Sequence, residues 1–302
     1  MLSLNNPLKT KFKSCLRVVC HAFAGAVCAG VVLLTAASVQ AQNLFVGTSG
    51  GIGSILKFTP DGTQSSFNSG LPALALAFNS AGDLFVSGTG SSIVEITPDG
   101  TQSTFVSGVA GWGLAFNSTG DLFVSDYGSG NIYEFTPGGA KSTFASGLNH
   151  PFSLAFNSAG DLFEADIGSG NIYEFTPGGV RSIFASGVVG GFGLAFNSAG
   201  DLFAAADYGI YRFTPDGTQS TFASGLFDTW GLAFNSAGDL FATANRFGSI
   251  LEFTPDGAQS TFASGLNDYL GGLAFQPVPE PASLSLLAFS VFGLALLRRR
   301  RG

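Results

Sequence analysis

Residues 113–148 read GLAFNSTGDLFVSDYGSGNIYEFTPGGAKSTFASGL, and this stretch decides the fold. Its Leu-Ala-Phe-Asn element recurs along the chain with the asparagine at Asn79, Asn117, Asn157, Asn197 and Asn235, and a degenerate copy ends at Gln276. Its Thr-Pro element recurs at Pro60, Pro98, Pro137, Pro177, Pro215 and Pro255. Neighbouring copies are 38 to 41 residues apart. Two markers that keep one period indicate a repeat architecture.

Each copy predicts four short β-strands. In the quoted copy they are residues 114–116, 121–124, 132–135 and 142–145. The segment Asn-Ser-Thr-Gly-Asp favours a tight turn after the first strand, because Asn and Gly tolerate left-handed conformations. Thr-Pro followed by Gly-Gly or Asp-Gly favours a turn after the third strand. Four strands in about 40 residues are typical of a β-propeller blade. Six copies therefore predict an all-β, six-bladed β-propeller of four-stranded blades.

The two ends of the repeat region predict how the ring closes. The region begins at residues 43–46, which form a second strand, and ends at residues 273–275, which form a first strand. We expect the C-terminal strand to complete the first blade, which removes open sheet edges. One phenylalanine per strand should fill the space between blades without polar atoms to satisfy.

Residues 1–41 have the pattern of a helical secretory signal peptide. Basic residues at positions 9–17 precede an apolar run over 18–37, and small side chains at Val39 and Ala41 predict cleavage after Ala41. An uncleaved N-terminal anchor is the alternative. The three cysteines, Cys15, Cys20 and Cys28, all lie in this segment. The processed protein would therefore contain no disulfide and no thiolate site.

Residues 277–302 form a second targeting segment. An apolar run over 282–297 lies between a Pro-Glu-Pro motif and a basic cluster; these residues are Pro279, Glu280, Pro281, Arg298, Arg299, Arg300 and Arg301. The run is short for a transmembrane helix, which usually takes about 20 residues, and the arginines would hold their end in the cytoplasm. The order of these parts resembles the PEP-CTERM sorting signal.

The PEP-CTERM resemblance implies a destination. The host would be a Gram-negative bacterium that makes an exopolysaccharide matrix. The chain would be held in the inner membrane by the C-terminal helix until an exosortase-type enzyme removes the tail near residues 279–281. It would then reach the cell surface or the extracellular matrix. A plain C-terminal membrane anchor is the alternative.

The region between these segments, residues 42–276, is strongly acidic. It carries 5 basic and 19 acidic side chains, a formal net charge of −14, whereas the whole chain has −7. Such a domain is repelled by phosphates and by anionic lipid, so we exclude nucleic acid as a partner.

The repeat resembles the NHL-type propeller unit and the related units of gluconolactonase-like and streptogramin-lyase-like proteins. The matching residues are 113–116, 120–126 and 131–137, and the resemblance extends over residues 43–275. It implies a propeller but no particular activity. Gluconolactonase-like enzymes would need a divalent metal in the central channel, and the lyase-like relatives need histidines. After processing His150 is the one histidine left, which disfavours the histidine-dependent chemistries.

One pair of carboxyl groups is a candidate cation site. Glu164 lies in a strand column that other copies fill with Val46, Val86, Val124, Ala204 and Ala242. A buried, unpaired carboxylate costs several kcal/mol. Asp166 follows on the same side of the strand. The pair would suit Ca²⁺ or another divalent cation, while a solvated or paired structural role is the alternative.

The loops that enter each first strand vary most between copies. They contain the candidate binding residues Trp112, His150, Phe152, Phe192, Asp228, Trp230, Asp268 and Tyr269. Variable loops on a repeated scaffold commonly carry binding sites, and aromatic rings stack on sugars or grip peptides. A hydrophobic plug that closes the channel is the alternative.

These observations predict an exported, non-enzymatic propeller that binds a glycan or a protein. A metal-dependent hydrolase or lactonase of gluconolactonase-like type, with its site near Glu164 and Asp166, is the second hypothesis. A structural matrix protein without a specific ligand is the third.

Overall fold

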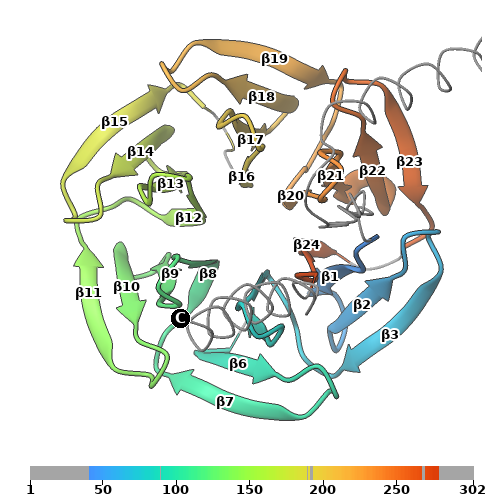
Figure 1. Ribbon diagram of the computed structural model, residues 1–302, viewed down its shortest axis with the longest axis horizontal. Coiled ribbons are helices and arrows are strands. Elements are labelled where there is room, and N and C mark those ends of the chain that lie inside the picture. The colour runs from blue at the N-terminus through green and yellow to red at the C-terminus, as the bar shows by residue number, and fades with distance from the viewer. Residues whose placement is uncertain (1–40, 89, 189, 191–192, 267–268, 279–302) are drawn as a thin grey trace, which may run out of the picture. The chain divides into compact units, whose positions relative to one another are not determined.

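The computed structural model describes residues 41–88, 90–188, 190, 193–266 and 269–278. Among them, six four-stranded antiparallel sheets are arranged around a central axis as the blades of a propeller (Figure 1). The predicted signal peptide and C-terminal helix lie outside the described residues. Within the described part of the chain, no helix is long and apolar enough to span a membrane.

The strand order follows the chain within every blade except blade 1, whose innermost strand comes from the C-terminal end of the repeat region. Blade 1 is β24 (Leu270–Phe275), β1 (Leu44–Thr48), β2 (Ser54–Phe58) and β3 (Gln64–Ser69). Blade 2 is β4 (Ala75–Phe78), β5 (Leu84–Ser87), β6 (Ser92–Ile96) and β7 (Gln102–Ser107). Blade 3 is β8 (Gly111–Phe116), β9 (Leu122–Asp126), β10 (Asn131–Phe135) and β11 (Lys141–Ala145).

The second half of the ring repeats this order. Blade 4 is β12 (Pro151–Phe156), β13 (Leu162–Asp166), β14 (Asn171–Phe175) and β15 (Arg181–Ser186). Blade 5 is β16 (Leu194–Phe196), β17 (Leu202–Ala206), β18 (Gly209–Phe213) and β19 (Gln219–Ser224). Blade 6 is β20 (Leu232–Phe234), β21 (Leu240–Ala244), β22 (Ser249–Phe253) and β23 (Gln259–Ala263), with a short 3₁₀ helix η1 (Asn245–Phe247) between β21 and β22.

The ring closes as the sequence predicts. Strand β24 pairs antiparallel with β1, with Phe275 opposite Leu44 and Leu273 opposite Val46. At the junction the Gln276 N–H donates to the Asn43 carbonyl at 2.9 Å, and Asn43 Nδ2 donates to Gln276 Oε1 at 3.0 Å. In the other blades the corresponding side-chain contact joins an Asn and an Asp within one turn, so the closing blade keeps this contact between two distant chain segments.

The turn after each first strand is held by its asparagine. In blade 3, Asn117 Oδ1 accepts the main-chain N–H groups of Thr119 at 3.0 Å and Asp121 at 2.8 Å. Asn117 Nδ2 donates to Asp121 Oδ2 at 3.1 Å. The same contacts recur from Asn79, Asn157, Asn197 and Asn235. The aspartates of these turns are thus structural, as the repeat indicates.

Replacing one of these asparagines should weaken the protein measurably. Each hydrogen bond contributes about 0.5–1.5 kcal/mol net, so we expect Asn117→Ala to lower the free energy of unfolding by about 2 kcal/mol. Urea denaturation measures this change. Ser118→Ala in the same exposed turn is the control, and an equal loss in both variants would contradict the assigned role of Asn117.

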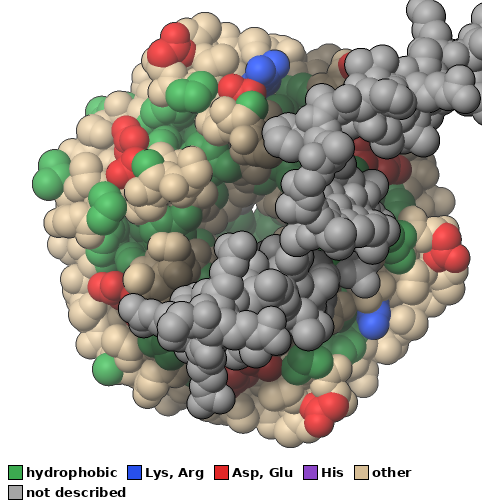
Figure 2. Space-filling view, in the orientation of Figure 1, with side chains coloured by type: hydrophobic (Ala, Val, Ile, Leu, Met, Phe, Trp, Pro, Cys, Tyr) green, Lys and Arg blue, Asp and Glu red, His purple; other side chains and the backbone are tan. Residues whose placement is uncertain are grey.

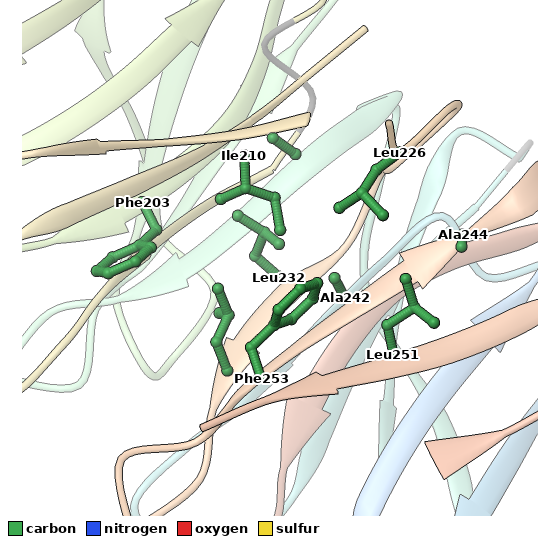
Figure 3. Packing of buried hydrophobic residues seen from close by; sticks show 10 residues of the cluster. Phe203, Ile210, Leu226, Leu232, Ala242, Ala244, Leu251 and Phe253 are labelled. Atoms are coloured by element: carbon green, nitrogen blue, oxygen red, sulfur yellow. The ribbon is translucent and has the colours of Figure 1, made fainter. Parts of the chain in front are cut away.

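Phenylalanines fill the space between blades, as predicted. Phe123 of blade 3 meets Phe144 of its own blade and Phe156 of blade 4 edge-on, with ring centroids 5.0 Å apart in both pairs. Equivalent T-shaped triplets form around Phe45, Phe85, Phe163, Phe203 and Phe241. Aliphatic side chains complete each layer, as Figure 3 shows for Phe203, Leu226, Leu232 and Phe253 between blades 5 and 6.

Because neighbouring strands are antiparallel, the turns and the variable loops lie on opposite faces of the propeller. One face, here called the repeated-turn face, carries the turns between first and second strands and the Thr-Pro turns between third and fourth strands. The other, the loop face, carries the connections between second and third strands and the crossovers between blades. The candidate binding residues that the structure describes therefore lie on the loop face.

Candidate functional site

The central channel is lined by three successive positions of the inner strands. They enclose a cavity of about 120 Å³. The middle position holds the small residues Ala75, Gly113, Ser153, Gly193, Gly231 and Gly272, and the lowest holds Leu76, Leu114, Leu154, Leu194, Leu232 and Leu273. Toward the loop face the lining residues are Leu74, Trp112, Phe152 and Trp230. Three of these four lining residues are aromatic, so aromatic rings lie around the channel mouth.

These rings meet across the channel. Trp112 of blade 3 and Trp230 of blade 6 come from opposite sides of the ring, as the positions of β8 and β20 in Figure 1 show, yet their centroids lie 6.4 Å apart. Phe152 contacts both, at 5.3 Å from Trp112 and 5.4 Å from Trp230. The three rings therefore roof the channel, which is the arrangement that a hydrophobic plug requires.

Further rings extend this roof outward. Tyr127 lies 5.1 Å from Trp112 and 4.4 Å from His150, and Tyr269 lies 5.0 Å from Trp230, measured between ring centroids. His150 and Tyr269 are exposed. We call the connected set the aromatic platform; its members are Trp112, Tyr127, His150, Phe152, Trp230 and Tyr269. The structure thus brings together five of the predicted binding residues. Tyr127 was missed, although an aromatic side chain just after the second strand was a readable signal.

Two candidate residues have unusual backbone conformations. His150 has a φ of 61° and Asp228 a φ of 55°, in the left-handed region that few residues other than glycine adopt. Such conformations cluster at functional sites. Burial raises the pKa of Tyr269, and the Asp228 carboxylate raises it further. Asp228 therefore lies within electrostatic reach of the platform. Phe192 and Asp268, also predicted, lie outside the described residues.

The position of Phe152 in this roof depends on Gly113, which lies beneath the rings and has no side chain. A Cβ atom added to Gly113 would lie 2.1 Å from the carbonyl oxygen of Phe152, which is impossible without a backbone shift. The Phe152 carbonyl instead accepts a hydrogen bond from Ser125 Oγ at 2.5 Å. This contact fixes Phe152 of blade 4 to the neighbouring blade 3.

Glu164 lies in the core between blades. Its side chain is 0% exposed, and among the described residues neither carboxyl oxygen makes a hydrogen bond of normal geometry, although the Phe152 main chain lies close enough to lower the pKa of the group. Burial raises the pKa of Glu164 well above its usual value, and the charge of Asp166 adds to the effect; the Phe152 main chain and Arg181 oppose it. Glu164 is therefore an enclosed carboxyl group rather than a solvated one.

Asp166 has structural partners instead. Its Oδ2 accepts the N–H of Asn149 at 2.6 Å, and its Oδ1 accepts the N–H of Ser169 at 2.9 Å. Asp126 likewise accepts N–H groups of Gly128 and Ser129, both at 3.1 Å. Across the described ranges no three His, Cys, Asp or Glu side chains lie close enough to hold a metal ion. The metal role of Glu164 and Asp166 stays a prediction.

The C-terminal motif residues Pro279, Glu280, Pro281 and Arg298 to Arg301 lie outside the described residues. Their sequence is informative by comparison: residues 277–301 match the PEP-CTERM protein-sorting motif. This confirms the predicted sorting signal. None of the curated proteins matches the chain.

Solved structures support the fold. The chain is similar to a propeller in the nidogen/laminin complex, with a TM-score of 0.71 and 18% identity over 80% of this chain and 100% of that one. A gluconolactonase from Xanthomonas campestris aligns with a TM-score of 0.58 and 22% identity, over 63% of this chain and 75% of that one. An inactive variant of virginiamycin B lyase from Staphylococcus aureus, solved with quinupristin, gives a TM-score of 0.60 and 16% identity over 79% and 94%.

These likenesses confirm the predicted resemblance to NHL-like and gluconolactonase-like propellers, and at such low identity they show the fold alone. The sorting motif adds a destination, since it implies export, C-terminal sorting in Gram-negative bacteria and recognition by exosortase. The chain is a six-bladed β-propeller that carries a PEP-CTERM sorting signal.

Proposed function

We propose that this propeller is a non-enzymatic binding module of the cell surface or the extracellular matrix, and that it takes a glycan or a protein on the aromatic platform. The observation that carries the proposal is the meeting of rings from opposite blades at the channel mouth, with exposed rings beside them. Because these rings already contact one another, they are held in place before a ligand arrives, which lowers the entropic cost of binding.

The charges around the platform limit the kinds of ligand that it would bind. Asp126, Asp166, Asp207 and Asp228 lie on the loop face, against the single positive charge of Arg246 among the described residues there. A polyanion would be repelled by this surface. A neutral or positively charged ligand therefore suits the platform better than a polymer rich in uronic acids.

Binding should depend on Tyr269. Its side chain is 45% exposed while its ring contacts Trp230. The few interface residues that cost more than 1 kcal/mol when truncated are enriched in Tyr and Trp, so we expect Tyr269→Ala to weaken binding about tenfold. An array of neutral and acidic oligosaccharides, probed with residues 42–278, measures this for glycans, and matrix proteins immobilised in the same format measure it for proteins.

Ile183→Ala is the matched control, because Ile183 is 62% exposed but lies on the outer strand β15. The proposal predicts that this variant binds as the parent does. Binding that is lost equally in both variants, or that is indifferent to Tyr269, would place the ligand elsewhere.

Calcium binding distinguishes the hydrolase hypothesis from this proposal. A lactonase site at Glu164 and Asp166 requires saturable one-site binding of Ca²⁺ that Glu164→Ala abolishes. Because Glu164 is enclosed and Asp166 is hydrogen-bonded to its loops, we expect calorimetric titration of the parent to show no such binding. A saturable site lost in the variant would favour the enzyme.

A further inference from the structure

The chain leaves the propeller at a fixed point. Beyond β24, the Gln276 carbonyl accepts a hydrogen bond from Gln42 Nε2 at 3.0 Å, and Gln276 Oε1 accepts one from Asn43 Nδ2 at 3.0 Å. Gln42 Oε1 in turn accepts the main-chain N–H of Ser236, in a turn of blade 6, at 2.8 Å. The segments that enter and leave the ring are thus tied to each other and to a neighbouring blade.

This point lies on the repeated-turn face. A groove of about 440 Å³ is lined by the two chain segments and by turn residues of blade 2; the lining residues are Ala41, Gln42, Asn43, Ser80, Ala81, Gly82, Pro98, Gln276, Pro277 and Val278. The aromatic platform lies at the other end of the channel. The height of a blade therefore separates the exit of the chain from the proposed binding surface.

The tether that follows is short. The sorting motif begins at residue 277, two residues after the end of β24, and its apolar run begins at residue 282. Residues 277–281 span at most about 18 Å when fully extended. The propeller thus has little room to turn over once the apolar run is held by a membrane.

We propose that the repeated-turn face lies toward the membrane that holds the sorting tail, and that the aromatic platform points away from it. The platform is then open to ligand while the tail is still attached, and removal of the tail releases the propeller without uncovering a binding site. An uncleaved N-terminal segment would give the same orientation, because residues 41–43 leave from the same face.

The tether, rather than charge, sets this orientation. Four aspartates in the Thr-Pro-Asp turns, Asp61, Asp99, Asp216 and Asp256, are fully exposed, and hydrogen bonds from the preceding threonine hydroxyls, first among several, lower the pKa of each. Ionised carboxylates are repelled by anionic headgroups. Figure 2 shows acidic side chains spread around the face in view, with few basic ones.

The test uses the full chain with Cys15, Cys20 and Cys28 replaced by serine, reconstituted in phosphatidylcholine vesicles. A single cysteine is introduced as Ser118→Cys on the repeated-turn face or Ser129→Cys on the loop face. Both positions are exposed and belong to blade 3, so they form a matched pair. Each carries a fluorophore, and a nitroxide on the lipid headgroup quenches labels that come near the membrane surface.

We expect at least twofold stronger quenching at position 118 than at position 129. Equal quenching, stronger quenching at position 129, or failure of the chain to float with the vesicles would overturn the proposal. A flexible insert of about 30 Gly and Ser residues after Val278, together with a second such insert before Ala41 that frees the N-terminal apolar segment, should remove the difference, because linkers of this length allow the propeller to turn over. If the difference persisted with the inserts, the face itself would bind lipid, and the tether would not be the cause.

Discussion

A chain that ends at Leu266 is expected to be unfolded, whereas a chain that ends at Val278 keeps its full stability. The shorter chain lacks β24, which covers the edge of β1 and buries Leu270 and Leu273. Each buried leucine contributes about 1.5–3 kcal/mol, and Leu44 and Val46 of β1 would lose their cover as well. The total approaches the 5–15 kcal/mol by which domains of this kind are stable. Circular dichroism melts of residues 42–266 and 42–278 measure the difference.

The stability of the chain that ends at Val278 also bears on removal of the sorting tail. Because the matched motif begins at residue 277, a cut near residues 279–281 falls after the last hydrogen bond between Gln276 and Asn43. Tail removal should therefore cost the propeller nothing. A cooperative melt of the 42–266 chain at the temperature of the longer one would show that β24 does not close the ring.

The second large effect that we expect is a gain in stability. Glu164→Val restores the residue type that blades 1 to 3 have in this column. It removes an enclosed carboxyl group whose oxygens make no hydrogen bond of normal geometry among the described residues. Burial of an unpaired polar group costs about 1–3 kcal/mol by mutational measures. We therefore expect a higher free energy of unfolding in this variant, measured by urea denaturation.

The stability gained by Glu164→Val should increase with pH. Burial raises the pKa of Glu164 above that of the unfolded chain, so between the two pKa values the folded state binds more protons than the unfolded state. Stability due to this group is therefore lost as pH rises from the unfolded value of about 4.3, by about 1.4 kcal/mol per pH unit, until the folded pKa is reached. The advantage of Glu164→Val should be smallest near pH 4 and should widen toward pH 7.

Val124→Ala is the matched control, because it occupies the same column in blade 3 and contains no ionisable group. Its difference from the parent should not vary with pH. A Glu164→Val advantage that stays constant from pH 4 to pH 7 would mean that the carboxyl is ionised in the folded protein and has found a partner.

The repeat was enough to predict the blades, their four strands, the closing strand and the phenylalanine layers. Each of these follows from local turn chemistry and from alternation, which act within about 40 residues. Asn117 stabilises its own turn, and the alternation of side chains along its strand directs Phe123 toward the next blade. The roles of both residues can therefore be predicted from one copy of the repeat.

The site was only partly readable. The loops of Trp112, Phe152 and Trp230 stood out as variable. Whether the rings of blades 3 and 6 touch, however, depends on the diameter of the channel, which no single repeat encodes. The small residues beneath the rings, such as Gly113, set that diameter by letting inner strands approach closely. The same limit applies to Glu164, whose enclosure depends on how blades 3 and 4 pack.

The central claim is that the aromatic platform is the binding surface, and tryptophan emission tests it most directly. Trp112 and Trp230 are the two tryptophans of the chain, and both belong to the platform. Titration of residues 42–278 with the best ligand from the array should shift or quench their emission, with the same midpoint as binding. Saturable binding that leaves the emission unchanged would contradict the account, because the ligand would then lie away from both rings.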